Sequence, residues 1–201
     1  CQTKKICLTV SGEDCKDFEQ VLTPIVKIKV KNEEDIKSEI ADALYDCNSL
    51  FGEGKLNFMP SPDWGEERYC LICARIAFDD KAKEEIKQIK VIELFEFMSK
   101  KADSQKRSYL EYVYPGLPSG GSSEKILEEI KNKNPAAKDI PLGNWVIDFN
   151  VDGGHAITSQ ILKAGKWAQK LSTIGTFVVA VGGTILGVAL SSTGVLSPLG
   201  I

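Results

Sequence analysis

The sequence predicts an α+β domain, with a small mixed or antiparallel sheet and flanking helices, followed by a C-terminal transmembrane helix. Three observations carry this prediction. Apolar residues alternate with lysine over residues 25–31, which is typical of a half-buried strand. Apolar residues recur at helical spacing between Ile36 and Cys47. Finally, no charged residue follows Lys170 in this chain of 201 residues.

These observations divide the chain into four parts. We expect a disulfide-stabilised domain over residues 1–160 and a basic juxtamembrane segment over 161–170. A transmembrane helix over 171–196 and a short tail over 197–201 follow. The net charge of −3 gives no electrostatic reason to expect a nucleic-acid partner.

The first half of the domain shows alternating strands and helices. Ile6–Val10 and the alternating stretch after Pro24 are expected strands, and Asn32 is a suitable N-cap for the helix that ends near Cys47. Tyr69–Phe78 is a mostly apolar run, which predicts an interior strand. Asp79 or Asp80 is then expected to cap one helix whose apolar positions extend to Met98.

The second half is less regular. A short aromatic segment over 108–114 precedes a flexible Gly/Ser stretch, and Ser122 or Ser123 is expected to cap a short helix. Alternation over 145–151 predicts another strand before the turn-forming Asp152-Gly153-Gly154. His155–Leu162 fits either a return strand or a helix that leads into the membrane segment.

The uncharged run over 171–196 is long enough to cross a bilayer as a helix, which makes membrane lipid the expected partner. Gly183 and Gly187 form a GxxxG pattern, which lets a second helix pack closely. The alternative is a buried hairpin or core helix of the same domain. The lysines at 163, 166 and 170 favour a cytoplasmic position for this flank, whereas the cysteines favour an extracytoplasmic domain.

The cysteines admit three interpretations. The six, which are Cys1, Cys7, Cys15, Cys47, Cys70 and Cys73, allow many pairings. Structural disulfides are favoured, and a bond from Cys47 to Cys70 or Cys73 would close the loop between them. Cys70-Leu71-Ile72-Cys73 has the spacing of a redox motif, but it lies within an expected strand. A zinc site would take Cys70 and Cys73 with two further ligands, such as Cys47 and one N-terminal cysteine, but the sequence lacks a second CxxC or a CxxH, so no metal is expected.

Two further segments contain weak candidates for a binding or catalytic site. The Gly/Ser stretch over 116–123 lacks the lysine of a phosphate-binding loop, so a linker is the better interpretation. His155 could act as a general base with Asp152 and Ser159, but a solvated turn residue is the simpler interpretation. No cofactor motif is present, and no catalytic residues are assigned.

Three stretches of the sequence resemble a known group of proteins. They are Ile40–Cys47, the Phe51-Gly-Glu-Gly-Lys55 turn, and Cys70-Leu-Ile-Cys-Ala-Arg-Ile-Ala-Phe-Asp79. The chain is similar in these residues to uncharacterised membrane-anchored proteins of DPANN archaea, which have small genomes. The resemblance covers roughly Cys7 to Tyr114. It implies a membrane helix upstream of Cys1 and an external domain, and it brings no known activity.

Together these features predict an envelope protein that is anchored in the membrane and whose domain binds or organises a protein partner. The alternatives are a thiol–disulfide exchange enzyme that uses Cys70 and Cys73, a hydrolase that works through His155, and a subunit of a larger membrane complex. The soluble domain is expected on the extracytoplasmic side, where disulfides persist.

Overall fold

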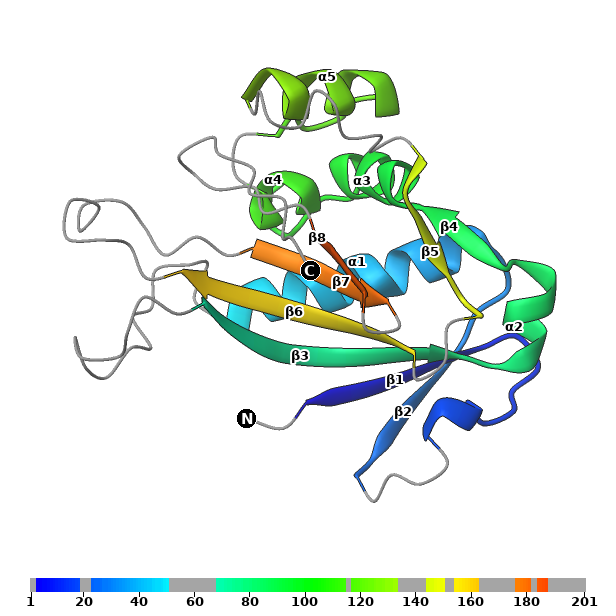
Figure 1. Cartoon of the computed structure of the whole chain (residues 1–201). Coiled ribbons are helices and arrows are strands. Elements are labelled where there is room, and N and C mark those ends of the chain that lie inside the picture. Colours follow the sequence, from blue (N-terminus) through cyan, green and yellow to red (C-terminus); the bar gives the residue numbers. More distant parts are fainter. Residues whose placement is uncertain are drawn as a thin grey trace, which may run out of the picture.

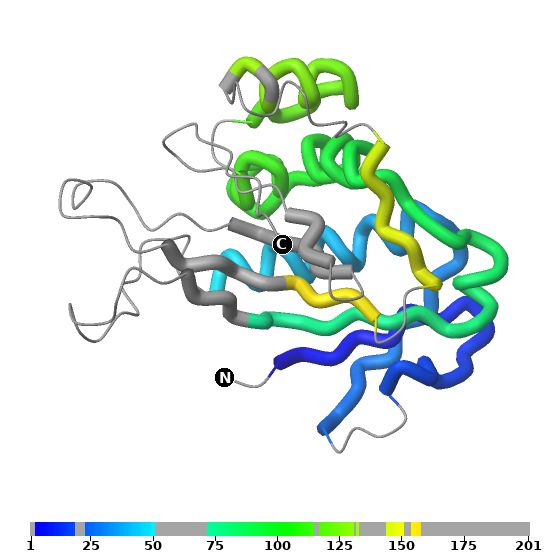
Figure 2. Tube along the Cα trace, viewed as in Figure 1, coloured from blue at the N-terminus to red at the C-terminus, as the bar shows by residue number. Residues whose placement is uncertain are grey.

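The computed structural model of the chain describes residues 3–18, 23–50, 68–114, 117–133, 144–150, 154–162, 176–181 and 184–187 (Figures 1 and 2). These residues form an α+β fold with one mixed six-stranded sheet, a two-stranded sheet and helices, which confirms the predicted fold class at this level. The strand order of the large sheet is β2-β1-β3-β6-β7-β8. Its strands are β1 (Lys4–Thr9), β2 (Ile25–Lys29), β3 (Arg68–Phe78), β6 (His155–Leu162), β7 (Thr176–Val181) and β8 (Thr184–Gly187).

One half of the sheet is parallel and the other is antiparallel. β1 pairs in parallel with both β2 and β3, whereas β3–β6, β6–β7 and β7–β8 are antiparallel. The chain passes from β1 to β2 through η1 (Lys16–Phe18) and from β2 to β3 through α1 (Glu33–Leu50). Asn32 caps α1 as expected, because its Oδ1 accepts a hydrogen bond of 2.9 Å from the Asp35 amide.

Helices cover one face of the sheet (Figure 1). α1 lies against β3 and β6, while α3 (Val91–Lys100) and α4 (Tyr109–Val113) pack on α1, and α5 (Ser123–Lys133) packs on α3. The opposite face is contacted by η1. The largest fully buried side chains on the helical side include Ile6, Leu8, Ile36, Leu44, Ile76, Phe78, Leu94, Met98 and Leu110.

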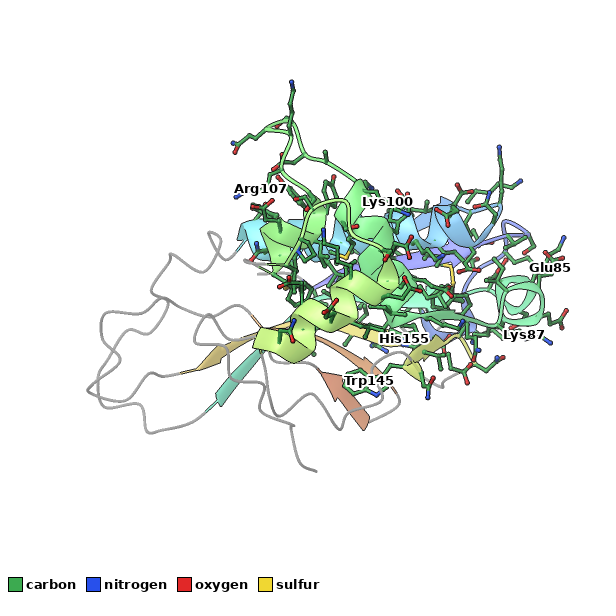
Figure 3. The ribbon with its side chains drawn as sticks, turned by 90° about the horizontal axis from the view of Figure 1, so that it is seen from above. Glu85, Lys87, Lys100, Arg107, Trp145 and His155 are labelled. Carbon is green, nitrogen blue, oxygen red and sulfur yellow. A yellow bond between two sulfur atoms is a disulfide. The ribbon has the colours of Figure 1, made fainter. Side chains whose placement is uncertain are left out.

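The prediction of a single helix after Asp79 is wrong. The structure has α2 (Asp80–Glu85), the short strand β4 (Gln88–Lys90) and then α3. Lys87 has a φ of +66°, which is left-handed and ends α2 (Figure 3). β4 then pairs with β5 (Val146–Asp148), so the apolar spacing that predicted one helix is divided between three elements.

The prediction of a transmembrane helix over 171–196 is also wrong for the residues described there, because these residues form β7 and β8. None of the helices in the described ranges is long and apolar enough to cross a membrane. The strands are rich in valine, threonine and isoleucine, which favour β-structure. They are separated in the sequence by Gly182-Gly183, a pair typical of two-residue hairpin connections. The hairpin alternative therefore fits, and Gly187 pairs with Val178 rather than with another helix.

The domain boundary expected at residue 160 falls inside β6, and β7 and β8 extend the sheet that contains β1 to β3. The first two residues of the expected basic segment over 161–170 belong to β6, while residues 163–170, Gly183 and the tail over 197–201 lie outside the described residues. His155–Leu162, which fitted either a strand or a helix, is the central strand β6.

Asp79 ties the parallel strands together at their carboxyl ends. Its side chain is buried and accepts hydrogen bonds from the Thr9 hydroxyl at 2.6 Å and from the Ser11 amide and hydroxyl at 2.9 and 2.7 Å. It also caps α2 by accepting a bond of 2.9 Å from the Ala82 amide. Burial alone would raise the pKa of Asp79, but these hydrogen bonds outweigh it and lower the pKa to about 2.

Replacement of Asp79 by asparagine should destabilise the fold, because an amide NH2 group would face the donors of Thr9 and Ser11. We expect the free energy of unfolding to fall by about 3 kcal/mol in urea at neutral pH. Because the folded pKa lies below the unfolded value of about 3.9, the stabilisation is present above about pH 4 and is lost toward about pH 2. The variant should lack this acid-dependent loss. Asp80→Asn, which alters an exposed carboxylate, is the control and should keep it.

Candidate functional site

A pocket of about 370 Å³ lies between the C-terminal end of α1 and the sheet. Its walls come from the start of β1, the last two turns of α1, and β3. The lining residues are Lys4, Ala43, Asp46, Cys47, Ser49, Leu50, Cys73 and Ala74. The volume lies in the range of small ligand-binding sites and suits an apolar side chain of a partner. The pocket is therefore the candidate site of this domain.

A disulfide between Cys47 of α1 and Cys73 of β3 lines this pocket, and its two Cα atoms are 5.5 Å apart. Of the two partners expected for Cys47, the structure has Cys73. A β-bulge brings this about, because the register passes from Ile72↔Thr158 to Ala74↔Ile157, so that Cys73 is the extra residue of β3 at this point. Without the bulge, the Cys73 side chain would lie on the other face of the sheet. The bulge directs it toward α1 instead.

α4 fixes the end of α1 that forms the pocket. Asn48 is buried and donates a hydrogen bond of 2.8 Å from Nδ2 to the Tyr112 carbonyl. The Ser49 hydroxyl and the Tyr112 phenol lie 2.7 Å apart, and the Tyr45 and Tyr112 rings stack at 4.2 Å. These contacts hold the last turns of α1 from the side opposite to the disulfide, so the pocket has a rigid wall.

The pocket walls are mainly apolar, with one ion pair. Ala43, Ala74 and Leu50 supply aliphatic surface, and Leu50 is 68% exposed although it is a large hydrophobic residue. Lys4 and Asp46 form an exposed ion pair of 3.4 Å. An apolar side chain of a bound peptide would fit this space, and the polar main chain beside it could contact the Lys4–Asp46 ion pair.

The remaining cysteines lie away from the pocket. Cys7 and Cys15 form a second disulfide, and both are buried with Phe18 and Ala77 on the face opposite to the helices. Cys70 belongs to β3 by its main chain, while its side chain and Cys1 lie outside what the structure describes. In the described ranges, no group of His, Cys, Asp and Glu residues is arranged to hold a metal ion.

His155 is not the solvated turn residue that its sequence context suggested. It is only 3% exposed, begins β6, and lies edge-on to Phe78 beneath the helices (Figure 3). The chain comes this close because Gly154 has a φ of +71°, and a Cβ there would lie 2.6 Å from the Ile76 carbonyl oxygen. Among the described residues, neither ring nitrogen has a hydrogen-bond partner.

The hydrolase grouping around His155 is also not assembled. Ser159 is four positions along the same extended strand, so their Cα atoms are about 13 Å apart. Asp152 lies outside the described residues. Burial lowers the pKa of His155, and the nearby Asp148 opposes the shift only in part. The lowered pKa favours the neutral imidazole at neutral pH, and the ring belongs to the core.

The Gly/Ser stretch joins helices rather than binding phosphate. The Ser123 hydroxyl donates a hydrogen bond of 2.6 Å to the Glu96 carboxylate, and the Ser119 hydroxyl donates one of 2.8 Å to Glu111. Ser122 caps α5 by accepting a hydrogen bond of 3.4 Å from the Lys125 amide. These serines thus contact acceptors of α3 and α4, and two carboxylates at this position would repel a phosphate.

Comparisons with protein-family models, with curated proteins and with solved structures find no match to this chain. The interpretation of the pocket therefore depends on its own geometry. Sequence reasoning identified Cys47 and Cys73 but missed Lys4, Asp46 and Leu50. The signal for Leu50 was an apolar residue placed just after the inner stripe of α1, followed directly by Phe51.

Removal of the disulfide in the pocket should cost more stability than removal of the other. The Cys47–Cys73 bond closes a sequence separation of 26, and the Cys7–Cys15 bond one of 8. The chain-entropy estimate gives about 3.5 kcal/mol for the first and about 2.5 kcal/mol for the second. Paired Cys→Ala variants, compared by urea unfolding under oxidising conditions, test this order. Equal or reversed losses would contradict it.

His155 should make the fold sensitive to mild acid. Its folded pKa lies below the unfolded value of about 6.5, so the unfolded chain takes up the proton first. The contribution of neutral His155 to the free energy of unfolding is therefore fully present above about pH 6.5. It falls as the pH decreases, by at most about 1.4 kcal/mol per pH unit. His155→Phe keeps an aromatic ring against Phe78 and should remove this dependence. Urea unfolding at about pH 7.5 and about pH 5.5 measures the difference. An unchanged pH dependence in the variant would contradict the assignment.

Proposed function

We propose that this protein is a binding module of the cell envelope, which receives an apolar group of a partner protein in the pocket beside the Cys47–Cys73 disulfide. The observation that carries the proposal is a concave, mainly apolar site of about 370 Å³ with Leu50 exposed at its edge. An exposed large apolar residue beside a preformed pocket is typical of a surface that another molecule covers.

The two disulfides support an oxidising, extracytoplasmic compartment for the domain. The Cys47–Cys73 bond also explains how the pocket stays open. Cys47 lies in the last turn of α1, and its covalent bond to β3 prevents this helix end from closing onto the sheet or separating from it. Membrane attachment through residues 171–196 is no part of the proposal, because the described residues there form a hairpin.

The alternative is thiol–disulfide exchange, and one observation favours it, since the pocket gives access to a disulfide. The bond involved would be Cys47–Cys73 and not the Cys70–Cys73 pair of the sequence motif. Two features oppose it. Cys47 is fully buried, and it lies at the negative end of the α1 dipole, which disfavours the thiolate that exchange would release. We therefore propose that the bond is structural.

Selection of short peptides from a random displayed library on the oxidised full chain tests the binding function. Enriched peptides should share an apolar anchor residue and bind the pocket, which NMR shift changes at Lys4, Asp46 and Leu50 would report. Leu50→Asp should weaken their binding by about tenfold or more, since it places a charge at the apolar edge. Leu50→Met should retain it.

Val26→Asp is the matched control, because Val26 is another exposed apolar residue but lies on β2, away from the pocket. It should leave unchanged the affinity of peptides that shift the NMR signals of the pocket residues. Peptides without a common apolar anchor, or peptides that are equally sensitive to both aspartate variants, would overturn the proposal. Rapid reduction of Cys47–Cys73 by a peptide dithiol, followed by a mass increase of one mixed disulfide, would favour the exchange enzyme instead.

A further inference from the structure

Among the described residues, β2 is an edge strand of the large sheet (Figure 1). Within the described part of the chain it pairs only with β1, in parallel, over Ile25–Lys29. The Val30 amide continues this pairing by donating a hydrogen bond of 2.9 Å to the Thr9 carbonyl. Unpaired N–H and C=O groups along such an edge are a template for one more strand.

The register shows which main-chain groups face outward. In a strand the N–H and C=O groups of successive residues point to opposite edges. Because the amide of Val30 faces β1, those of Ile28 and Val26 face β1 as well. The main chain of Ile25, Lys27 and Lys29 therefore points away from the sheet.

The side chains of β2 give this edge a chemical pattern. Lys27 and Lys29 lie on the face of the sheet that carries their partners Cys7 and Thr9, and Val26 lies on the helical side with Ile6. Ile25 and Val26 are 40% and 42% exposed. The Lys27 ammonium forms an ion pair of 2.5 Å with the Asp14 carboxylate, whereas Lys29 has no ionic partner among the described residues.

We propose that β2 binds an extended segment of another protein in which acidic and apolar residues alternate, added as a further strand to the sheet. The main chain of Ile25, Lys27 and Lys29 would bond to this segment. Its acidic side chains would lie beside Lys27 and Lys29, and its apolar side chains beside Val26 and Ile28. The surface is separate from the pocket, so this inference does not depend on the proposed function.

A second copy of the same strand fits this edge poorly. In an antiparallel pair of two β2 strands centred on Lys27, the two Lys27 side chains would lie directly opposite each other. Like charges in directly opposite positions destabilise a sheet. The lysines thus select against self-association and in favour of an acidic strand, which is a common use of charge on sheet edges.

A capped, fluorescently labelled peptide of alternating glutamate and valine, about nine residues long, is the probe. Fluorescence polarisation with the full chain should show saturable binding that weakens between low salt and about 0.5 M salt. Hydrogen exchange followed by NMR gives the specific readout. On binding, the amides of Lys27 and Lys29 should become protected, while those of Ile28 and Val30 are already protected in the free protein.

Three variants control the experiment. Lys29→Pro removes an outward N–H without removing a bond to β1 and should abolish binding, whereas Lys29→Ala should weaken it by up to about fivefold. The double variant Lys27→Glu/Lys29→Glu should lose the glutamate peptide and bind a matched peptide of alternating lysine and valine. This exchange of preference remains informative even if the proline variant does not fold.

Equal affinity of the wild-type chain for the two peptides would overturn the proposal. So would binding without protection at Lys27 and Lys29, or dimerisation of the chain through β2 in light scattering, abolished by Lys29→Pro.

Discussion

The carboxylate of Asp79 holds together the part of the sheet on which the other features depend. It joins the carboxyl ends of β1 and β3 through Thr9 and Ser11, and it starts α2 through Ala82. The register between β1 and β3 pairs Cys7 with Ala77 on one face, and the bulge in β3 directs Cys73 toward α1 on the other. A buried charge without these donors would be costly, so the network either forms completely or opposes folding. This makes the strand ends well defined without a bound ligand.

The two faces of the sheet are stabilised in different ways. The helical face buries a continuous core, which can hold the domain together by apolar burial. The other face buries only a small cluster of Cys7, Cys15, Phe18 and Ala77. A cluster of this size contributes little by apolar burial, so the Cys7–Cys15 bond fixes the η1 segment covalently, and Arg75 lies 5.5 Å from the centre of the Phe18 ring. The exposed lysines of β2 belong to this thinner side.

The sequence could predict elements whose signal is local. Lysine alternation located β2, the Asn32 cap and helical spacing located α1, and the apolar run located β3. The prediction for the run over 171–196 is wrong because an uncharged stretch of valine, threonine and glycine is compatible with both a membrane helix and a buried hairpin. Only the pairing of β7 with β6 decides between the two. The pocket could not be predicted because the bulge at Cys73 moves one side chain to the other face. A bulge depends on the register of the neighbouring strand, which no local pattern records.

β1 relates the two proposed surfaces to each other. Lys4 at its start lines the pocket, while Lys5, the next residue, pairs with Ile25 at the start of β2. Successive residues of a strand point to opposite faces, so β1, which lies between β2 and β3, holds the pocket and the outer lysines in a fixed relation. A partner that placed an apolar side chain in the pocket and an acidic strand on β2 would make its second contact within the same molecule. Its affinity would then exceed that of either contact alone through effective concentration, provided that the linking segment can pass around the edge of the sheet at β2.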